Sequence, residues 1–220
     1  RAVAATLGAR GGPVHVNFPF DKPLEPIDPP DAFGDEHPLA ARGRADGLPF
    51  VQIEQSPRSL GDGELEALFA GSDPRRGVIV AGPCENAASV APVVARFAAA
   101  TGFPLLADPL SGARYGALEG APVVAGYDVF LRDAELRDQL EPTLVVRIGA
   151  SPVSASLQRW LFQHARAEQI VIDDGMRWKD HGTTASRYVQ ADAADTLGRL
   201  ADSWQRGDVP GAHRATPDWQ

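Results

Sequence analysis

The sequence predicts a doubly wound α/β domain, with a mainly parallel, Rossmann-like sheet covered by helices on both faces. Three observations predict it. The strand-like segments are short and continuously apolar, which is typical of parallel strands that are buried on both faces. Segments whose apolar residues recur at helical spacing separate them. Turns that contain Gly or Pro stand between the two kinds of segment. The crossover connections are therefore expected to be right-handed.

The two kinds of segment alternate along residues 50–206, which we interpret as one compact α/β domain. Five apolar segments are predicted to be strands: 77–81, 103–107, 143–148, 169–173 and 187–190. Four segments with helical spacing are predicted to be helices: 61–70, 86–101, 156–167 and 192–204. The clearest helix ends at Gly102, a helix stop signal, and its residues Val90, Val94 and Phe97 share one face.

The residues outside this domain divide into three parts. Residues 1–20 are interpreted as the end of a helix followed by a strand of alternating apolar and polar residues. Residues 21–49 are rich in Pro, Asp and Gly and predict an interdomain linker, because Pro fixes φ and lacks a backbone donor. Residues 207–220 predict a second linker. A helix end in a chain that starts with Arg1 leads us to expect a fragment of a longer protein.

Composition argues against several classes of partner. The formal net charge is -8, and no block of Lys or Arg is present, so we expect neither nucleic-acid binding nor binding to anionic lipid. No apolar run approaches the roughly 20 residues that span a membrane. The single cysteine, Cys84, excludes a disulfide within the chain, which fits a reducing compartment. We therefore expect a cytoplasmic protein.

The usual nucleotide-binding motifs are missing. In a dinucleotide fold a G-x-G-x-x-G loop follows the first strand and lets the backbone approach a pyrophosphate. Neither the loop 82–86 nor the loop 149–153 matches it, and no phosphate-binding P-loop occurs. NAD, FAD or ATP binding is therefore not predicted. Asp173 and Asp174, where such a fold would hold its ribose-binding acid, are interpreted as capping and turn residues.

No metal site or catalytic residue is predicted. Asp173, Asp174, Asp180 and His181 match no standard ligand spacing, so turn and surface roles are favoured for them. Cys84 could lie near a helix start, which lowers the pKa of a thiol, but a small packing residue is the favoured interpretation.

The loop 149–156 is the strongest candidate for a ligand-binding site. It joins a predicted strand to a predicted helix at the edge where ligands bind in this fold. Backbone N–H groups at the helix start and the hydroxyls of Ser154 and Ser156 could hold a carboxylate, with Arg159 one turn further along. Alternatively, Ser154 only caps the helix. From the residues alone, both interpretations stay open.

Several segments, taken together and in order, resemble one enzyme family: 12–20, 22–26, 76–82, 103–112, 145–154 and 170–174. The combination is similar to the SEPHCHC synthases (2-succinyl-5-enolpyruvyl-6-hydroxy-3-cyclohexene-1-carboxylate synthases). These are thiamine-diphosphate enzymes of menaquinone biosynthesis. The resemblance covers nearly the whole chain. Any one segment alone would be unspecific, because related decarboxylases and acetohydroxyacid synthases share the middle-domain fold.

This resemblance implies a three-domain enzyme that decarboxylates 2-oxoglutarate and adds the succinyl unit to isochorismate. Residues 1–20 would then close the pyrimidine-binding domain, residues 50–206 would be the central domain, and residues 207–220 would lead to the diphosphate-binding domain. The family's cofactor-activating Glu and its Mg²⁺ and diphosphate site belong to the two outer domains. Thiamine diphosphate and Mg²⁺ are therefore expected in the full-length homo-oligomer, and the chain alone is expected to bind neither and to be inactive.

One departure from the family bears on the site. Family members often carry Lys or Arg early in the helix after the Gly-x-x-x-x-Ser loop, where this chain has Ala155 and Ser156. Either Arg159 supplies the charge, or the domain contributes only backbone and hydroxyl contacts. Arg114, after the second predicted strand, is a further candidate.

Two other functions remain as alternatives. The chain could be a regulatory module that binds a small acid without chemistry. It could also be the middle domain of a different thiamine-diphosphate enzyme, such as an acetohydroxyacid synthase, which could bind FAD.

Overall fold

In the computed structural model, the chain forms two compact units. The described residues are 2–7, 12–19, 22, 32–54, 56, 58–116, 120–175, 178, 180–209 and 213–219. The units are Arg1–Ser56 and Pro57–Gln220. The whole sheet lies in the second unit.

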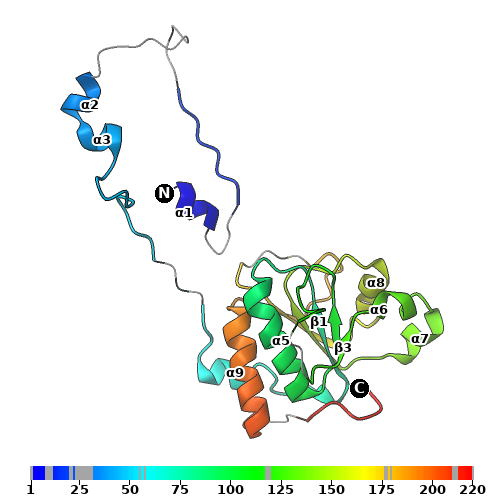
Figure 1. Ribbon diagram of the computed structural model, residues 1–220. Helices are drawn as coiled ribbons and strands as arrows, with labels where there is room; N and C mark the ends of the chain where they lie inside the picture. Colours follow the sequence, from blue (N-terminus) through cyan, green and yellow to red (C-terminus); the bar gives the residue numbers. More distant parts are fainter. Residues whose placement is uncertain are drawn as a thin grey trace. The chain divides into compact units, whose positions relative to one another are not determined.

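The first unit contains short helices, which are α1 (Ala2–Leu7), α2 (Ala32–Glu36) and α3 (Pro38–Arg42) (Figure 1). Of these, α2 and α3 fall within the range 21–49 that was interpreted as a linker. Residues 12–19 form no strand, so the strand prediction is wrong for them. A strand needs a hydrogen-bonded neighbour, and the described residues provide none for this segment, which leaves Val14, Val16 and Phe18 exposed.

The second unit is built on a six-stranded sheet, counted over its described residues. Its strands are β1 (Gly77–Ala81), β2 (Leu105–Ala107), β3 (Val123–Val124), β4 (Leu144–Ile148), β5 (Glu168–Ile172) and β6 (Arg187–Val189). Their order is β3-β2-β1-β4-β5-β6, and every neighbouring pair is parallel. The predicted doubly wound α/β fold is confirmed, and so are the five predicted strands.

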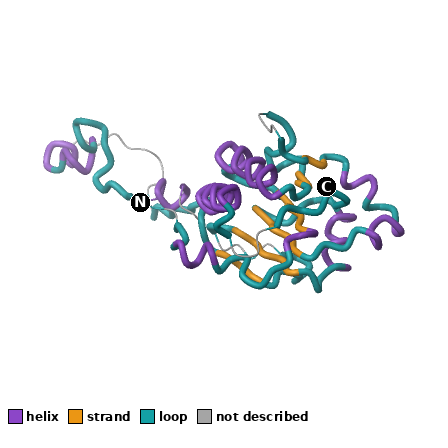
Figure 2. The backbone as a smooth tube through the Cα atoms, turned by 90° about the horizontal axis from the view of Figure 1, so that it is seen from below, coloured by secondary structure: helices purple, strands orange, loops and turns teal. Residues whose placement is uncertain are grey.

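Helices cover both faces of this sheet, as Figure 2 shows. They are α4 (Asp62–Glu66), α5 (Ala87–Thr101), α6 (Tyr127–Phe130), α7 (Ala134–Gln139), α8 (Ala155–Gln163) and α9 (Ala193–Arg206), and a 3₁₀ turn η1 (Pro74–Arg76) precedes β1. The long helices α5 and α9 lie side by side (Figure 1). Gly102 ends α5 in the left-handed conformation, with φ 71°, as its stop signal predicted.

Some predicted bounds differ from the structure. The helix predicted over 61–70 is only α4, and the one predicted over 156–167 ends with α8 at Gln163, before a turn that leads into β5. The elements β3, α6 and α7 were not predicted. They are too short to show a period in the sequence, having two, four and six residues.

The core consists of two layers, one on each face of the sheet. Alternate residues of β1 separate into them: Ile79 and Ala81 pack with α5 and α9, whereas Val78 and Val80 pack with α6 and α8. This alternation is the period of two that side chains follow along a strand. Both sets of side chains are buried, which explains why the sequence of β1 is continuously apolar.

The segment 213–219 packs across the amino edge of the sheet. The indole Nε1 of Trp219 donates to the carbonyl of Gly77 at 2.8 Å, and the Arg76 guanidinium lies 4.8 Å from the Trp219 ring centroid. The backbone N–H of Ala215 donates to the carbonyl of Thr101 at 3.0 Å. Residues 213–219, which belong to the range 207–220 that was interpreted as a second linker, are therefore held against the α/β domain by these contacts. Within the described ranges, no helix is both long and apolar enough to cross a membrane.

Candidate functional site

The topology places a crevice between β1 and β4. From β1 the chain continues to β2 and β3 on one side, and from β4 it continues to β5 and β6 on the other. The loops that follow β1 and β4 therefore leave in opposite directions. In open α/β sheets, ligands bind at this switch point, beyond the carboxyl ends of the strands.

Two glycines join the two loops at the floor of this crevice. The N–H of Gly82 donates to the carbonyl of Ile148, and the N–H of Ala150 donates to the carbonyl of Pro83, both at 2.9 Å. A Cβ on Gly82 would lie 1.7 Å from the carbonyl oxygen of Ala150. A Cβ on Gly149, whose φ is +75°, would lie 2.6 Å from the carbonyl oxygen of Pro83. Only glycine lets the backbones approach this closely.

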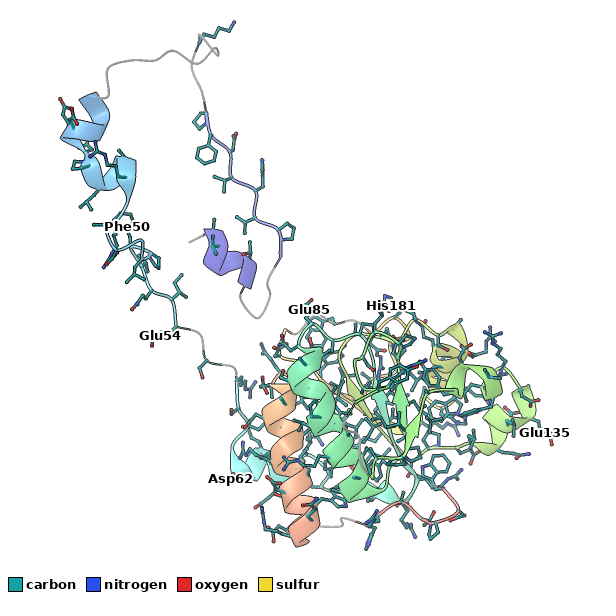
Figure 3. The ribbon with its side chains drawn as sticks, viewed as in Figure 1. Phe50, Glu54, Asp62, Glu85, Glu135 and His181 are labelled. Carbon is teal, nitrogen blue, oxygen red and sulfur yellow. The ribbon has the colours of Figure 1, made fainter. Side chains whose placement is uncertain are left out.

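A cavity of about 230 Å³ lies at this switch point, and we call it the switch cavity. It is lined by Pro83, Cys84, Glu85, Leu110, Gly149, Ala150, Asp173 and Tyr188. An adjoining recess of about 30 Å³ shares Glu85 and Asp173 and extends to Asp174 and Asp192. Figure 3 shows Glu85 at the edge of the unit where the loops gather. Among the residues that the structure describes, the charged side chains that line the cavity and the recess are carboxylates.

Two of the three serine hydroxyls in the predicted loop 149–156, those of Ser154 and Ser156, donate to the same carboxylate. Ser154 caps α8, since its Oγ accepts a hydrogen bond from the N–H of Leu157 at 3.1 Å. The same Ser154 hydroxyl donates to Asp128 Oδ1 at 2.5 Å, and the Ser156 hydroxyl donates to the same oxygen at 2.5 Å. The structure therefore brings Ser154 and Ser156 together, and both hydroxyls are already bonded to Asp128.

These bonds change the acidity of Asp128. The hydroxyl of Ser154, followed by that of Ser156 and by Arg132, lowers the pKa of the Asp128 carboxyl from 3.8 to about 2. Asp128 is therefore ionised at neutral pH, and an anion that approached the two hydroxyls would meet its negative charge. Asp128 could not be found from the sequence, because it lies in the unpredicted helix α6.

Replacing both Ser154 and Ser156 by Ala is expected to raise the pKa of Asp128 from about 2 towards 3.8, because two hydrogen bonds to the ionised carboxylate disappear. NMR titration of the aspartate carboxyl carbons measures this change. A Ser89→Ala variant is the control, since that hydroxyl lies in α5 and donates to the carbonyl of Asn86, the residue before the helix. An unchanged Asp128 pKa in the double variant would show that the hydroxyls do not bind it in solution.

The two candidate arginines lie on different elements. Arg159 is exposed on α8 and makes no hydrogen bond or ion pair with other described residues. Arg114 is half-buried, and its Nε donates to the carbonyl of Ala107, the last residue of β2, at 2.8 Å. Of the two, Arg159 has the guanidinium that is available for an external group.

Asp108 connects the loops after β2 and β4. Its carboxyl is fully buried and accepts the N–H of Leu110 at 2.9 Å and the N–H of Val153 at 3.0 Å. It fixes the start of the loop that leads into α8. A carboxylate directly after an apolar strand is the sequence signal that could have identified it.

A buried ion pair lies beneath the loop between β5 and β6. Arg147 in β4 is 4% exposed, and its Nη1 donates to Asp180 Oδ1 at 2.8 Å and to Thr184 Oγ1 at 3.2 Å. Its Nη2 donates to Ser151 Oγ at 3.3 Å. Of the turn and surface roles favoured for Asp180, the surface role is wrong, because the carboxylate pairs with a buried arginine, whereas the turn role is present, since the carboxylate also accepts the N–H of Ala185. The sequence signal for this ion pair is Arg147 itself, one charged residue within the otherwise apolar strand Leu144–Ile148.

The cysteine and the acidic side chains complete the description of the candidate residues. Cys84 is partly buried and packs against the core cluster that includes α5 and α9, as a packing residue would. Within the part of the chain that the structure describes, no three His, Cys, Asp or Glu side chains are grouped so that they could hold a metal ion.

The chain is similar in sequence to one family model and to several known proteins. The family model described as "Middle domain of thiamine pyrophosphate" matches residues 50–206. A protein of Halobacterium salinarum is 43% identical over 208 residues, which are 91% of this chain and 35% of the relative. A Natronomonas pharaonis protein is 39% identical over 229 residues, or 97% of this chain and 37% of the relative. A Listeria monocytogenes protein is 39% identical over 181 residues, which are 82% of this chain and 30% of the relative.

All three relatives bear the name 2-succinyl-5-enolpyruvyl-6-hydroxy-3-cyclohexene-1-carboxylate synthase. The chain spans between 30% and 37% of their lengths. The similarity therefore concerns about one third of the length of each relative.

Proposed function

Because this chain belongs to the middle-domain family of thiamine pyrophosphate enzymes, we propose that it is the central domain of a SEPHCHC synthase. In this proposal the full-length enzyme decarboxylates 2-oxoglutarate and adds the succinyl unit to isochorismate. The observation that carries it is the name shared by relatives that are 39–43% identical over most of the chain. The doubly wound fold agrees with the middle-domain match.

The described residues by themselves form no site for Mg²⁺, because no three of their His, Cys, Asp or Glu side chains are grouped as metal ligands. We therefore assign thiamine diphosphate and Mg²⁺ to the pyrimidine- and diphosphate-binding domains of the full-length enzyme. When bound there, the cofactor supplies the electron sink for decarboxylation.

The central domain then acts mainly as a scaffold that presents loops at the carboxyl edge of its sheet. Arg159 is the residue that we assign to an acidic substrate, because its guanidinium is exposed and makes no ion pair among the described residues. Ser154 and Ser156 position the start of α8 through Asp128, and they contact substrate only if these bonds rearrange. The proposal includes a cytoplasmic homo-oligomer, in which the active site forms between subunits.

The chain alone is expected to show no turnover of 2-oxoglutarate and isochorismate with added thiamine diphosphate and Mg²⁺. The full-length protein from the same gene is expected to form SEPHCHC under the same conditions. Product formation, followed by mass spectrometry, measures both. Turnover by the chain alone would overturn the assignment of the cofactor to other domains.

The full-length protein also separates this proposal from the related enzymes. A colourless preparation that converts 2-oxoglutarate and isochorismate supports a SEPHCHC synthase. A preparation with flavin absorbance and no such activity would instead favour a middle domain of the acetohydroxyacid synthase kind.

A further inference from the structure

Two exposed aliphatic residues are held together at the carboxyl edge of the sheet. Leu110, in the loop after β2, is 62% exposed, and Val153, which precedes the cap of α8, is 64% exposed. The buried carboxylate of Asp108 holds both, because one of its oxygens accepts the N–H of Leu110 at 2.9 Å and the other accepts the N–H of Val153 at 3.0 Å. The loops after β2 and β4 therefore present these two residues as neighbours.

A third aliphatic residue extends this surface. Val129 in α6 is 75% exposed, and α6 lies beside α8 (Figure 1). The residue before it, Asp128, accepts the hydroxyl of Ser154, which is the residue after Val153. The chain neighbours of Val129 and Val153 are thus hydrogen-bonded to each other. We call Leu110, Val129 and Val153 the carboxyl-edge patch.

The polar groups beside the patch are paired within the chain. Asp128 Oδ1 accepts the hydroxyls of Ser154 and Ser156, and Asp128 Oδ2 accepts Nη2 of Arg132 at 2.6 Å. The Asp108 carboxylate is fully buried and presents no charge to solvent. The surface that remains for a partner is apolar with a polar rim, which is typical of a protein interface.

The patch is ordered before any partner binds. Asp108 fixes both loops through backbone N–H groups. Ser154 caps α8 and at the same time bonds to Asp128 in α6. A surface that is already ordered loses little conformational entropy when it docks, which favours binding.

We propose that the carboxyl-edge patch is the docking surface for an apolar face of another domain of the full-length protein. This inference rests on the proposed function, in which the chain is one part of a longer enzyme, and it names the face through which that part is held. The length of the relatives supports this occupant, since the chain spans only 30–37% of them. A tethered domain has an effective concentration on the order of millimolar, so it reaches the patch before a second copy of the chain does.

Hydroxyl-radical footprinting tests the docking, because it labels side chains according to their exposure. The patch residues are expected to be labelled severalfold more slowly in the full-length protein than in the 220-residue chain. Phe162 is the internal control, since it is 67% exposed on α8 and lies outside the patch. Protection of the patch that is no greater than that of Phe162 would overturn the proposal.

The labelling does not require turnover, so it separates the docking from the proposed activity. A full-length protein that forms no SEPHCHC but protects the patch would contradict the activity and support the docking. An active protein whose patch is labelled as fast as in the chain would contradict only the docking.

A double variant tests the same surface through stability. Leu110→Ser combined with Val153→Ser is expected to lower the unfolding temperature of the full-length protein, because apolar contacts with the docked domain are lost. The unfolding temperature of the 220-residue chain is expected to stay almost unchanged, because both side chains are exposed in it. Phe162→Ser is the matched control and is expected to change neither protein. An equal decrease in the chain and in the full-length protein would contradict the docking.

Sedimentation of the 220-residue chain examines a second copy as the other occupant. The chain is expected to remain a monomer. A dimer that the double variant dissociates would show that a second copy covers the patch, and it would overturn the proposal.

Discussion

Replacing Asp180 by Asn is expected to lower the free energy of unfolding by about 3–5 kcal/mol, because the Arg147 guanidinium then stays buried without its counter-charge. The side chains of the pair are only 5% and 9% exposed. The other partners of Arg147 are neutral and cannot balance its charge: Gln169, Thr184 and Ser151. Urea unfolding of both proteins measures the difference.

An exposed ion pair provides the matched control. Arg199 Nη2 lies 2.6 Å from Asp62 Oδ1, but the Asp62 side chain is 93% exposed. Since water screens such a pair, Asp62→Asn is expected to cost about 1 kcal/mol or less. Equal losses for the two Asp→Asn changes would show that burial of Arg147 does not determine its dependence on Asp180.

The same pair gives a pH dependence. Burial acts to raise the pKa of Asp180, but hydrogen bonds from the N–H of Ala185 and from Arg147 outweigh it and hold the pKa below 3.8. A carboxyl whose pKa is lowered by folding stabilises the fold above its unfolded pKa, and this contribution disappears as the pH falls through the folded pKa. The stability difference between the wild type and Asp180→Asn is therefore expected to be full above about pH 4 and to shrink below it.

Replacing Phe97 by Ala is expected to lower the free energy of unfolding by about 3–5 kcal/mol, because it leaves a cavity among aromatic rings that cannot easily close. Phe97 in α5 is fully buried. Its ring centroid lies 6.3 Å from that of Phe69, 6.2 Å from that of Phe103 and 6.1 Å from that of Trp204. Thermal and urea unfolding measure the loss.

The same substitution on the surface is the control. Phe162 in α8 is 67% exposed, so Phe162→Ala is expected to change stability by no more than about 0.5 kcal/mol. A comparable loss at both positions would contradict the central place of the aromatic cluster in the core.

Much of the fold could be predicted because its signals are local. The helix up to Gly102 shows three apolar residues on one face and a glycine stop, and both features depend only on neighbours in the chain. The strand β1 is continuously apolar, and β4 and β5 are mostly apolar, because both faces of the sheet are buried. By contrast, β3, α6 and α7 are too short to show a period, and contacts with the rest of the unit decide their conformation.

The candidate site was predicted only in part. The sequence located the loop 149–156 correctly between a strand and a helix, and it identified Ser154 as a possible cap. It did not predict that the hydroxyls of Ser154 and Ser156 would both donate to Asp128, which lies 26 residues before Ser154. It also favoured turn and surface roles for Asp180, and it did not predict that this carboxylate pairs with Arg147 from 33 residues away.

The sequence by itself determined the fold class, the order of β1, β2, β4, β5 and β6 with the longer helices between them, and the likeness to a family of thiamine-diphosphate enzymes. These depend on local periodicity, on turn residues and on short segments in a given order. Only the tertiary structure decided which polar groups meet at the carboxyl edge of the sheet: Asp128 with the serines, Asp180 with Arg147, and Asp173 with the switch cavity. The physical reason is that electrostatic and hydrogen-bonding partners are selected by distance in space, and parallel strands bring together loops that are far apart in the chain.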